Sequence, residues 1–160
     1  GGYAGPGGGV REVNLPWIWV LDLENETDRN NHWSVSQDRG KTWSKPVATN
    51  LRGQVCSPIP LADGRVAALY NDRTDPGQGI KLAISEDLSN FDTENQITVF
   101  DPAQETTVGF PRQDTSLARN LVIGFGRPDG ICLQDDTLLT YFFGTIDGIS
   151  HTRWARIEVA

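Results

Sequence analysis

The stretch Ser36-Gln37-Asp38-Arg39-Gly40-Lys41-Thr42-Trp43 decides how this chain is expected to fold. Asp38 is typical of a tight turn, because its carboxylate can fold back onto backbone N–H groups. The Ser36 and Thr42 hydroxyls can close the same loop, and Gly40 can take a positive φ without steric cost. Trp43 offers a large apolar face that can hold the hairpin against the next layer. The stretch therefore predicts a turn between two short strands.

The same order of strands and turns recurs along the chain with a period of about 45 residues, which is typical of propeller blades. The full order is strand, Asp-Gly turn, strand, loop, strand, Ser-x-Asp turn, strand; the last unit lacks the Ser-x-Asp turn and ends without a fourth strand. We expect units at residues 10–52, 53–101 and 121–160, after a Gly-rich lead-in at 1–9 and with a long connection at 102–120. The expected strands are residues 16–24, 32–36, 44–49, 56–61, 66–71, 80–85, 96–100, 130–133, 137–143 and 149–159.

The second unit carries a degraded copy of the turn, running from Ser85 through Asp87 to Phe91. It lacks the glycine, and Phe91 stands where the first copy has tryptophan. Its place in the repeat is what makes it a counterpart. Residues 62–65 and 134–136 are expected as hairpin turns, the first because of its Asp-Gly pair.

Composition excludes several classes of protein. The formal charge is −7, so a nucleic-acid partner is disfavoured, and no run approaches the roughly 18 apolar residues of a membrane span. Cys56 and Cys132 could form one disulfide or stay free, and free thiols are favoured. With His32 and His151 as the only histidines, no metal site or cofactor is expected. The chain has no methionine, so we expect a processed or truncated product.

The motif S-x-D-x-G-x-T-W in these repeating units resembles the Asp-box of the sialidase superfamily. The resemblance implies a six-bladed β-propeller of four-stranded antiparallel blades, of which this chain holds about three. Its last unit, FGRPD followed by strands ending in RWAR, is similar to a closing blade. The resemblance thus implies a C-terminal half, completed by a second copy or by a missing N-terminal half. It also suggests a glycan ligand and a secreted or periplasmic location.

In sialidase-like proteins the active face lies opposite the Asp-boxes. Three arginines bind the substrate carboxylate there, since the guanidinium fork makes bidentate bonds, and a tyrosine and two carboxylates do the chemistry. The resemblance implies these substrate-binding residues: Arg73, Arg112, Arg127 and Asp129. It implies these catalytic residues: Asp72, Tyr70 and Tyr141. For each arginine the alternative is a bracing ion pair, and for each tyrosine a place in the core.

The chain departs from the family in two respects. It has no F-R-I-P stretch, and the sequence suggests no Tyr–Glu pair. Three hypotheses stay open: an exo-sialidase-like glycoside hydrolase that needs its second half, a non-catalytic carbohydrate-binding or protein-interaction propeller, and a small barrel or sandwich. A shallow surface lined by Trp17, Trp19 and Trp33 would favour binding without catalysis.

Overall fold

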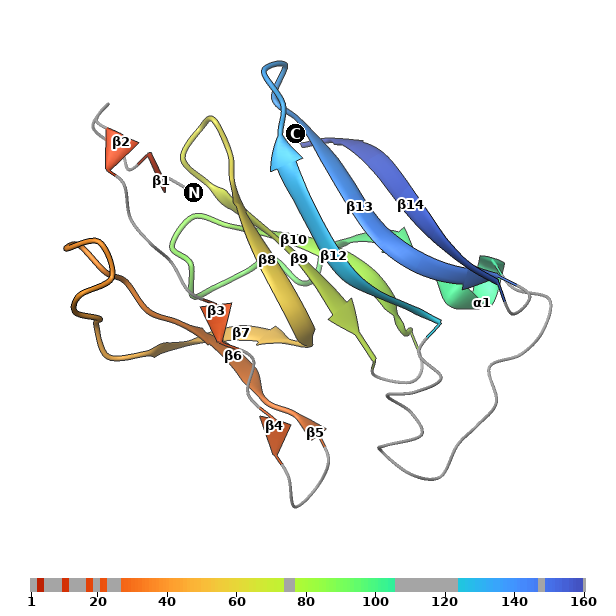
Figure 1. Ribbon diagram of the computed structural model, residues 1–160, viewed down its shortest axis with the longest axis horizontal. Coiled ribbons are helices and arrows are strands. Elements are labelled where there is room, and N and C mark those ends of the chain that lie inside the picture. The colour runs from red at the N-terminus through yellow and green to blue at the C-terminus, as the bar shows by residue number, and fades with distance from the viewer. Residues whose placement is uncertain are drawn as a thin grey trace.

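The computed structural model describes residues 3–4, 10–11, 17–18, 21–22, 27–73, 77–105, 124–146 and 149–159. Over these residues the fold is all-β, as predicted, with one short helix, α1 (Pro102–Glu105) (Figure 1). Two pairs of very short strands stand apart: β1 (Tyr3–Ala4) with β2 (Val10–Arg11), and β4 (Leu21–Asp22) with β5 (Thr27–Asp28). The other strands form three antiparallel sheets. Within the described ranges, no helix has the length and apolar character needed to cross a membrane.

The middle sheet is a four-stranded meander, with neighbours in chain order. It contains β8 (Gln54–Pro60), β9 (Val66–Asp72), β10 (Gly79–Ser85) and β11 (Ile97–Phe100). The register pairs Leu69 of β9 with Leu82 of β10. Strand β8 lies at an edge and has a register shift between Gln54 and Ser57, and an edge strand tolerates the two prolines that β8 carries.

The third sheet, β12 (Phe125–Cys132), β13 (Thr137–Ile146) and β14 (Ile149–Glu158), packs against one face of the middle sheet. The core between them contains Leu69 and Leu82 from the middle sheet and Leu138 from the third. The Phe100 ring lies 5.9 Å from that of Phe125 and 5.5 Å from that of Phe142, centroid to centroid. Tilted rings at this separation are favourable beyond their buried area.

The first sheet, β3 (Trp17–Ile18), β6 (Asn30–Trp33) and β7 (Val47–Arg52), covers the other face of the middle sheet. Leu51 of β7 packs with Ala68, Tyr70, Ala83 and Phe91 of the middle sheet. The middle sheet is therefore buried on both sides (Figure 1). This explains why β9 reads as a continuous apolar run in place of an alternating one.

Several elements differ from expectation. The strand expected at 32–36 is Asn30–Trp33. The strand expected at 44–49 is Val47–Arg52, because Ser44 first pairs with Val35 as part of the turn (N–O 2.9 Å). The strand expected at 130–133 begins at Phe125, because a register shift between Gly126 and Asp129 admits a proline. Helix α1 was not expected; the Asp101 carboxylate caps it by accepting the Ala103 N–H at 2.9 Å. No pairing within the described ranges joins one of the three sheets to another.

Candidate functional site

The turn at residues 36–43 is closed by the side chains of Ser36 and Asp38. The Asp38 carboxylate accepts the Thr42 N–H at 2.8 Å and the Thr42 hydroxyl at 2.6 Å. The Ser36 hydroxyl donates to Asp38 Oδ1 at 2.9 Å and accepts the Gly40 N–H at 2.7 Å. These bonds, the Thr42 hydroxyl above all, lower the pKa of Asp38 to about 2. Asp38 is thus an ionised structural group.

The turn at residues 85–91 repeats this arrangement without a glycine. The Ser85 hydroxyl donates to Asp87 Oδ1 at 3.1 Å. The Asp87 carboxylate accepts the N–H groups of Asn90 and Ser89 at 2.7 and 2.9 Å and the Asn90 side-chain amide at 2.8 Å. These bonds, led by the Asn90 N–H, lower the pKa of Asp87 to about 2. Phe91 follows, fully buried against the first sheet.

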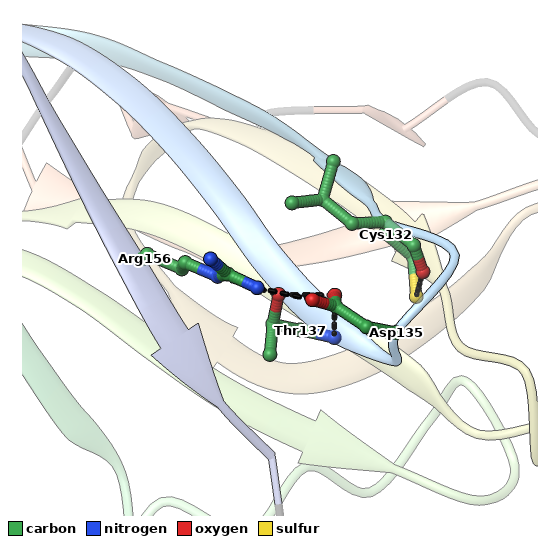
Figure 2. A network of polar contacts seen from close by, with 5 residues as sticks. Cys132, Asp135, Thr137 and Arg156 are labelled. Carbon is green, nitrogen blue, oxygen red and sulfur yellow. Dashed lines mark hydrogen bonds and ion pairs between the residues drawn. The ribbon is translucent and has the colours of Figure 1, made fainter.

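Both hairpin turns also depend on an aspartate. Asp63 accepts the Arg65 N–H at 2.9 Å, and Asp135 accepts the Thr137 N–H at 3.3 Å. Asp135 also forms an ion pair with Arg156 of β14, which ties the turn to the neighbouring strand (Figure 2). These contacts lower the pKa of both carboxyls; the Arg65 N–H has the largest effect on Asp63 and the Thr137 hydroxyl on Asp135.

The four turns lie at one end of the three sheets. We call this the turn end, formed by residues 36–43, 61–65, 85–91 and 133–137. The opposite end, where β7 and β9 end and β10 and β12 begin (Figure 1), is the loop end, formed by residues 52–54, 72–73, 77–79 and 124–127. The strand order places the expected active face at the loop end.

The loop end brings a cation of the middle sheet against the third sheet. The Arg73 guanidinium carbon lies 5.2 Å from the centre of the Phe125 ring, and its Nη2 lies 3.5 Å from the Phe125 carbonyl oxygen. Arg127 follows two residues later, exposed and with a positive φ of 48°. Asp72 directly precedes Arg73 and is half-buried. Three of the predicted site residues therefore belong to one end of two neighbouring sheets.

Tyr70 lies elsewhere. Its ring is buried in the core between the first and middle sheets, beside Leu51 and Phe91. Its hydroxyl donates to the Gln96 side-chain oxygen. This is the place in the core that the sequence left open as the alternative role of the residue.

Tyr141 and Asp129 form a pair on the outer face of the third sheet. The Tyr141 hydroxyl donates to Asp129 Oδ2 at 3.0 Å, and Asp129 Oδ1 accepts the Gly130 N–H at 2.8 Å. The Phe125 side chain packs on the other, inner face. The hydrogen bond to Asp129 raises the pKa of Tyr141, which disfavours the phenolate that a nucleophile requires. The structure thus unites Tyr141 with Asp129 and separates both from Arg73 and Tyr70.

Arg112 and most of the connection 102–120 lie outside the described residues, as does the side chain of Cys56. Cys132 is a free, half-buried thiol. Where the chain is described, no group of three or more His, Cys, Asp or Glu residues is placed to hold a metal ion.

Two structural partners were missed by the sequence. Asn50 donates its side-chain amide to the Phe91 carbonyl at 2.7 Å and accepts the Phe91 N–H at 2.8 Å. A strand placed at 44–49 leaves Asn50 in a loop, which is why it drew no attention. Phe125, the partner of Arg73, has no signal of its own beyond an aromatic residue before a glycine.

No protein-family model matches the chain, and no curated protein matches it. The function is therefore inferred from the arrangement of its residues.

Proposed function

We propose that the chain is half of a sialidase-type β-propeller and acts on glycans at the loop end. The other half of the ring comes from a second copy or from a further N-terminal half. In this proposal the enzyme is an exo-sialidase-like glycoside hydrolase, and the described residues supply part of its substrate site.

One observation carries the proposal. Two successive sheets, the first and the middle, carry a Ser-x-Asp turn at the same end; in both turns the serine hydroxyl donates to the aspartate, whose carboxylate accepts a backbone N–H from within the turn. The carboxylates of Asp38 and Asp87 are engaged in closing their turns, because both oxygens of each accept hydrogen bonds from within the turn. That leaves the loop end for recognition, as in the superfamily that the Asp-box resembles.

The loop end has the chemistry for an acidic sugar. The net charge of the chain is −7, so two arginines at one end of an acidic chain favour a carboxylate or another anion as ligand. The Arg73 guanidinium lies over the Phe125 ring, 5.2 Å from its centre, and this contact restricts the guanidinium and shields one side of it from water. A fixed guanidinium binds a carboxylate with two parallel hydrogen bonds. Asp72, next to Arg73, is the candidate acid/base.

A second function is a carbohydrate-binding propeller without catalysis. Two observations favour it: Tyr70 is committed to the core through Gln96, and the pKa of Tyr141 is raised by its bond to Asp129. Neither tyrosine is therefore placed as a nucleophile beside Arg73.

The test is a ¹⁵N NMR titration with N-acetylneuraminic acid, observing arginine side-chain signals, with its methyl ester as the neutral control. We expect the acid, and not the ester, to shift the Arg73 and Arg127 signals. The shifts should disappear in Arg73→Ala and Arg127→Ala and persist in Arg65→Ala, a matched arginine at the turn end. Circular dichroism of each variant shows whether folding is intact.

A fluorogenic sialoside assay on the same samples separates the two functions. Turnover that Asp72→Asn abolishes would support the hydrolase, and binding without turnover would support the binding module. Equal shifts by acid and ester, or shifts that survive both loop-end substitutions, would reject the acidic-sugar site.

A further inference from the structure

The middle and third sheets repeat each other with a constant offset of 72 residues. The hairpin turns have the same hydrogen bonds: Leu61 N to Arg65 O at 2.9 Å matches Leu133 N to Thr137 O at 2.8 Å. Gly64 and Asp136, which correspond to each other, both have positive φ, 94° and 62°. The register shifts also correspond, between Gln54 and Ser57 in β8 and between Gly126 and Asp129 in β12. Cross-strand pairing agrees too, with Leu69–Leu82 matching Tyr141–Trp154.

Corresponding residues differ sharply in exposure. Ile59 is 3% exposed and Ile131 is 55% exposed; Leu69 is 0% and Tyr141 is 48%; Leu82 is 1% and Trp154 is 71%. The three residues of the middle sheet are buried because the third sheet covers them. The three residues of the third sheet form an apolar surface that we call the outer face: Ile131, Tyr141 and Trp154. It is the face that a following sheet would cover.

The first sheet, at the other end of the stack, also exposes residues whose counterparts in the middle sheet are covered. Phe91 is 3% exposed because Leu51 and Asn50 of the preceding sheet lie on it. Its counterpart Trp43 is 47% exposed, and nearby Val47 is 42% exposed. The first sheet therefore presents the surface that a preceding sheet would cover. We call this surface, residues 39–47, the leading face.

The charges of the two faces are complementary. The leading face carries Arg39, Lys41 and Lys45, all exposed, and no acidic residue. The outer face is bordered at the same turn end by Asp136 and Glu158, both exposed, and by the Asp135–Arg156 ion pair. In a chain of net charge −7, a basic leading face opposite an acidic border favours contact between the two.

We propose that the outer face of one copy packs on the leading face of a second copy, in a head-to-tail dimer that closes as a ring. Each contact then repeats the packing of one sheet on the next that the chain already makes twice within itself. A heterologous contact of this kind closes when the rotation between copies returns to the start. Turn ends meet turn ends, so the complementary charges face each other. The inference rests on the sheet repeat and does not need the proposed glycan site.

The test is the oligomeric state of the intact chain, measured by sedimentation velocity over a wide concentration range. We expect a dimer, and a monomer for the Tyr141→Ser/Trp154→Ser double variant, whose fold should persist because both side chains are exposed. Ile149→Ser is the matched control: Ile149 is an exposed apolar residue of β14, 62% accessible, at a position whose parity turns it away from the outer face. This variant should remain dimeric.

Mixing variants tests the head-to-tail geometry. Trp154→Ser damages only outer faces, and Trp43→Ser damages only leading faces. A dimer of either variant alone would have both contacts damaged. A mixed dimer of the two variants would have one intact contact, so mixing the variants should restore association. Lys41→Glu should weaken the dimer, and adding Asp136→Lys should restore it.

Four results would overturn the proposal: a wild-type monomer at every concentration, a dimer that survives the double variant, no rescue on mixing, or open chains of many copies. A monomer whose Trp154→Ser variant loses binding to neutral sugars would assign the outer face to stacking of sugars instead. Each readout is an association state, so failure here leaves the acidic-sugar titration unaffected, and the reverse also holds.

Discussion

The turns at 36–43 and 85–91 are closed by similar hydrogen bonds but have very different surroundings. In both, a serine hydroxyl donates to an aspartate whose carboxylate closes the loop. The residue after each aspartate, Arg39 or Leu88, has a positive φ, 62° and 67°. The first turn is one residue longer and needs a second left-handed position, Gly40 at 85°. The glycine is thus required by the length of the turn, whereas serine and aspartate are required by its closure.

The aromatic residues after the two turns show what neighbouring sheets contribute. Phe91 is buried under the first sheet, and Trp43 lies half-exposed beside Gly40 of its own turn. Two similar turns are therefore expected to contribute differently to the free energy of unfolding, because only one of them is covered by a neighbouring sheet.

The largest expected effect comes from replacing the aromatic residue that follows each turn. Phe91→Ala removes a fully buried ring and should lower the free energy of unfolding by about 3–5 kcal/mol. Trp43→Ala, at a half-exposed site, should lower it by only about 1 kcal/mol. Urea denaturation of both variants below the dimerisation concentration measures the difference. Equal losses would show that the preceding sheet does not set the energetics.

The next effect concerns the link between sheets. Asn50→Ala removes both hydrogen bonds to the Phe91 backbone and should destabilise the chain by about 1–3 kcal/mol, since two backbone groups lose their partners. Hydrogen exchange of the Phe91 amide should accelerate as well. Asn30→Ala is the control, because Asn30 bonds to Arg52 within its own sheet; its Phe91 exchange should match the wild type.

Acid should affect the two turns equally. The pKa of Asp38 and that of Asp87 are each lowered from 3.8 to about 2, so both carboxylates bind protons more weakly in the folded chain. The stability they contribute is full above about pH 4 and is lost as the pH falls towards 2. The Tm of Asp38→Asn and of Asp87→Asn should fall less steeply over that window than the wild-type Tm. Unequal slopes would show that the two turns are not electrostatic equivalents.

The smallest effects sharpen the comparison of backbone conformation. Gly40→Ala should cost about 1–2 kcal/mol, because an L-residue is placed at positive φ. Arg39→Gly should stabilise by at most about 1 kcal/mol, since relief of the left-handed strain is partly offset by chain entropy. Thermal unfolding shows whether each variant is more or less stable than the wild type. Stabilisation by Gly40→Ala would contradict the claim that this position requires glycine.

Much of the fold could be predicted from local pattern. The alternation and Asp-Gly signals placed the strands β8 to β11 and β14 within about two residues, since turn chemistry sets their ends. Strand β13 begins where expected but ends at Ile146 in place of residue 143. The start of β12 could not be predicted, because a register shift allows a proline inside it. The start of β7 could not either, because Ser44 pairs as part of the turn.

The candidate site was predictable only in part. The order of strands and turns predicts that Arg73 and Arg127 lie at the same end of the sheets, because Arg73 follows β9 and Arg127 lies near the start of β12. The sequence could not tell which of Tyr70 and Tyr141 is buried, because a strand face is buried only where another sheet covers it. Tyr70 lies beneath the first sheet, and Tyr141 lies on the outer face.

Strand β14, with the sequence ISHTRWARIE, also bears on the solubility of the chain. It pairs with β13 along its length and, where the chain is described, has no strand on its other side. A long open edge with an exposed tryptophan is a template for fibril growth. In a fibril of in-register copies, each Arg153 and Arg156 would stack on its own image about 4.8 Å away, and the like charges would repel. These two arginines would therefore oppose growth of a fibril from the β14 edge.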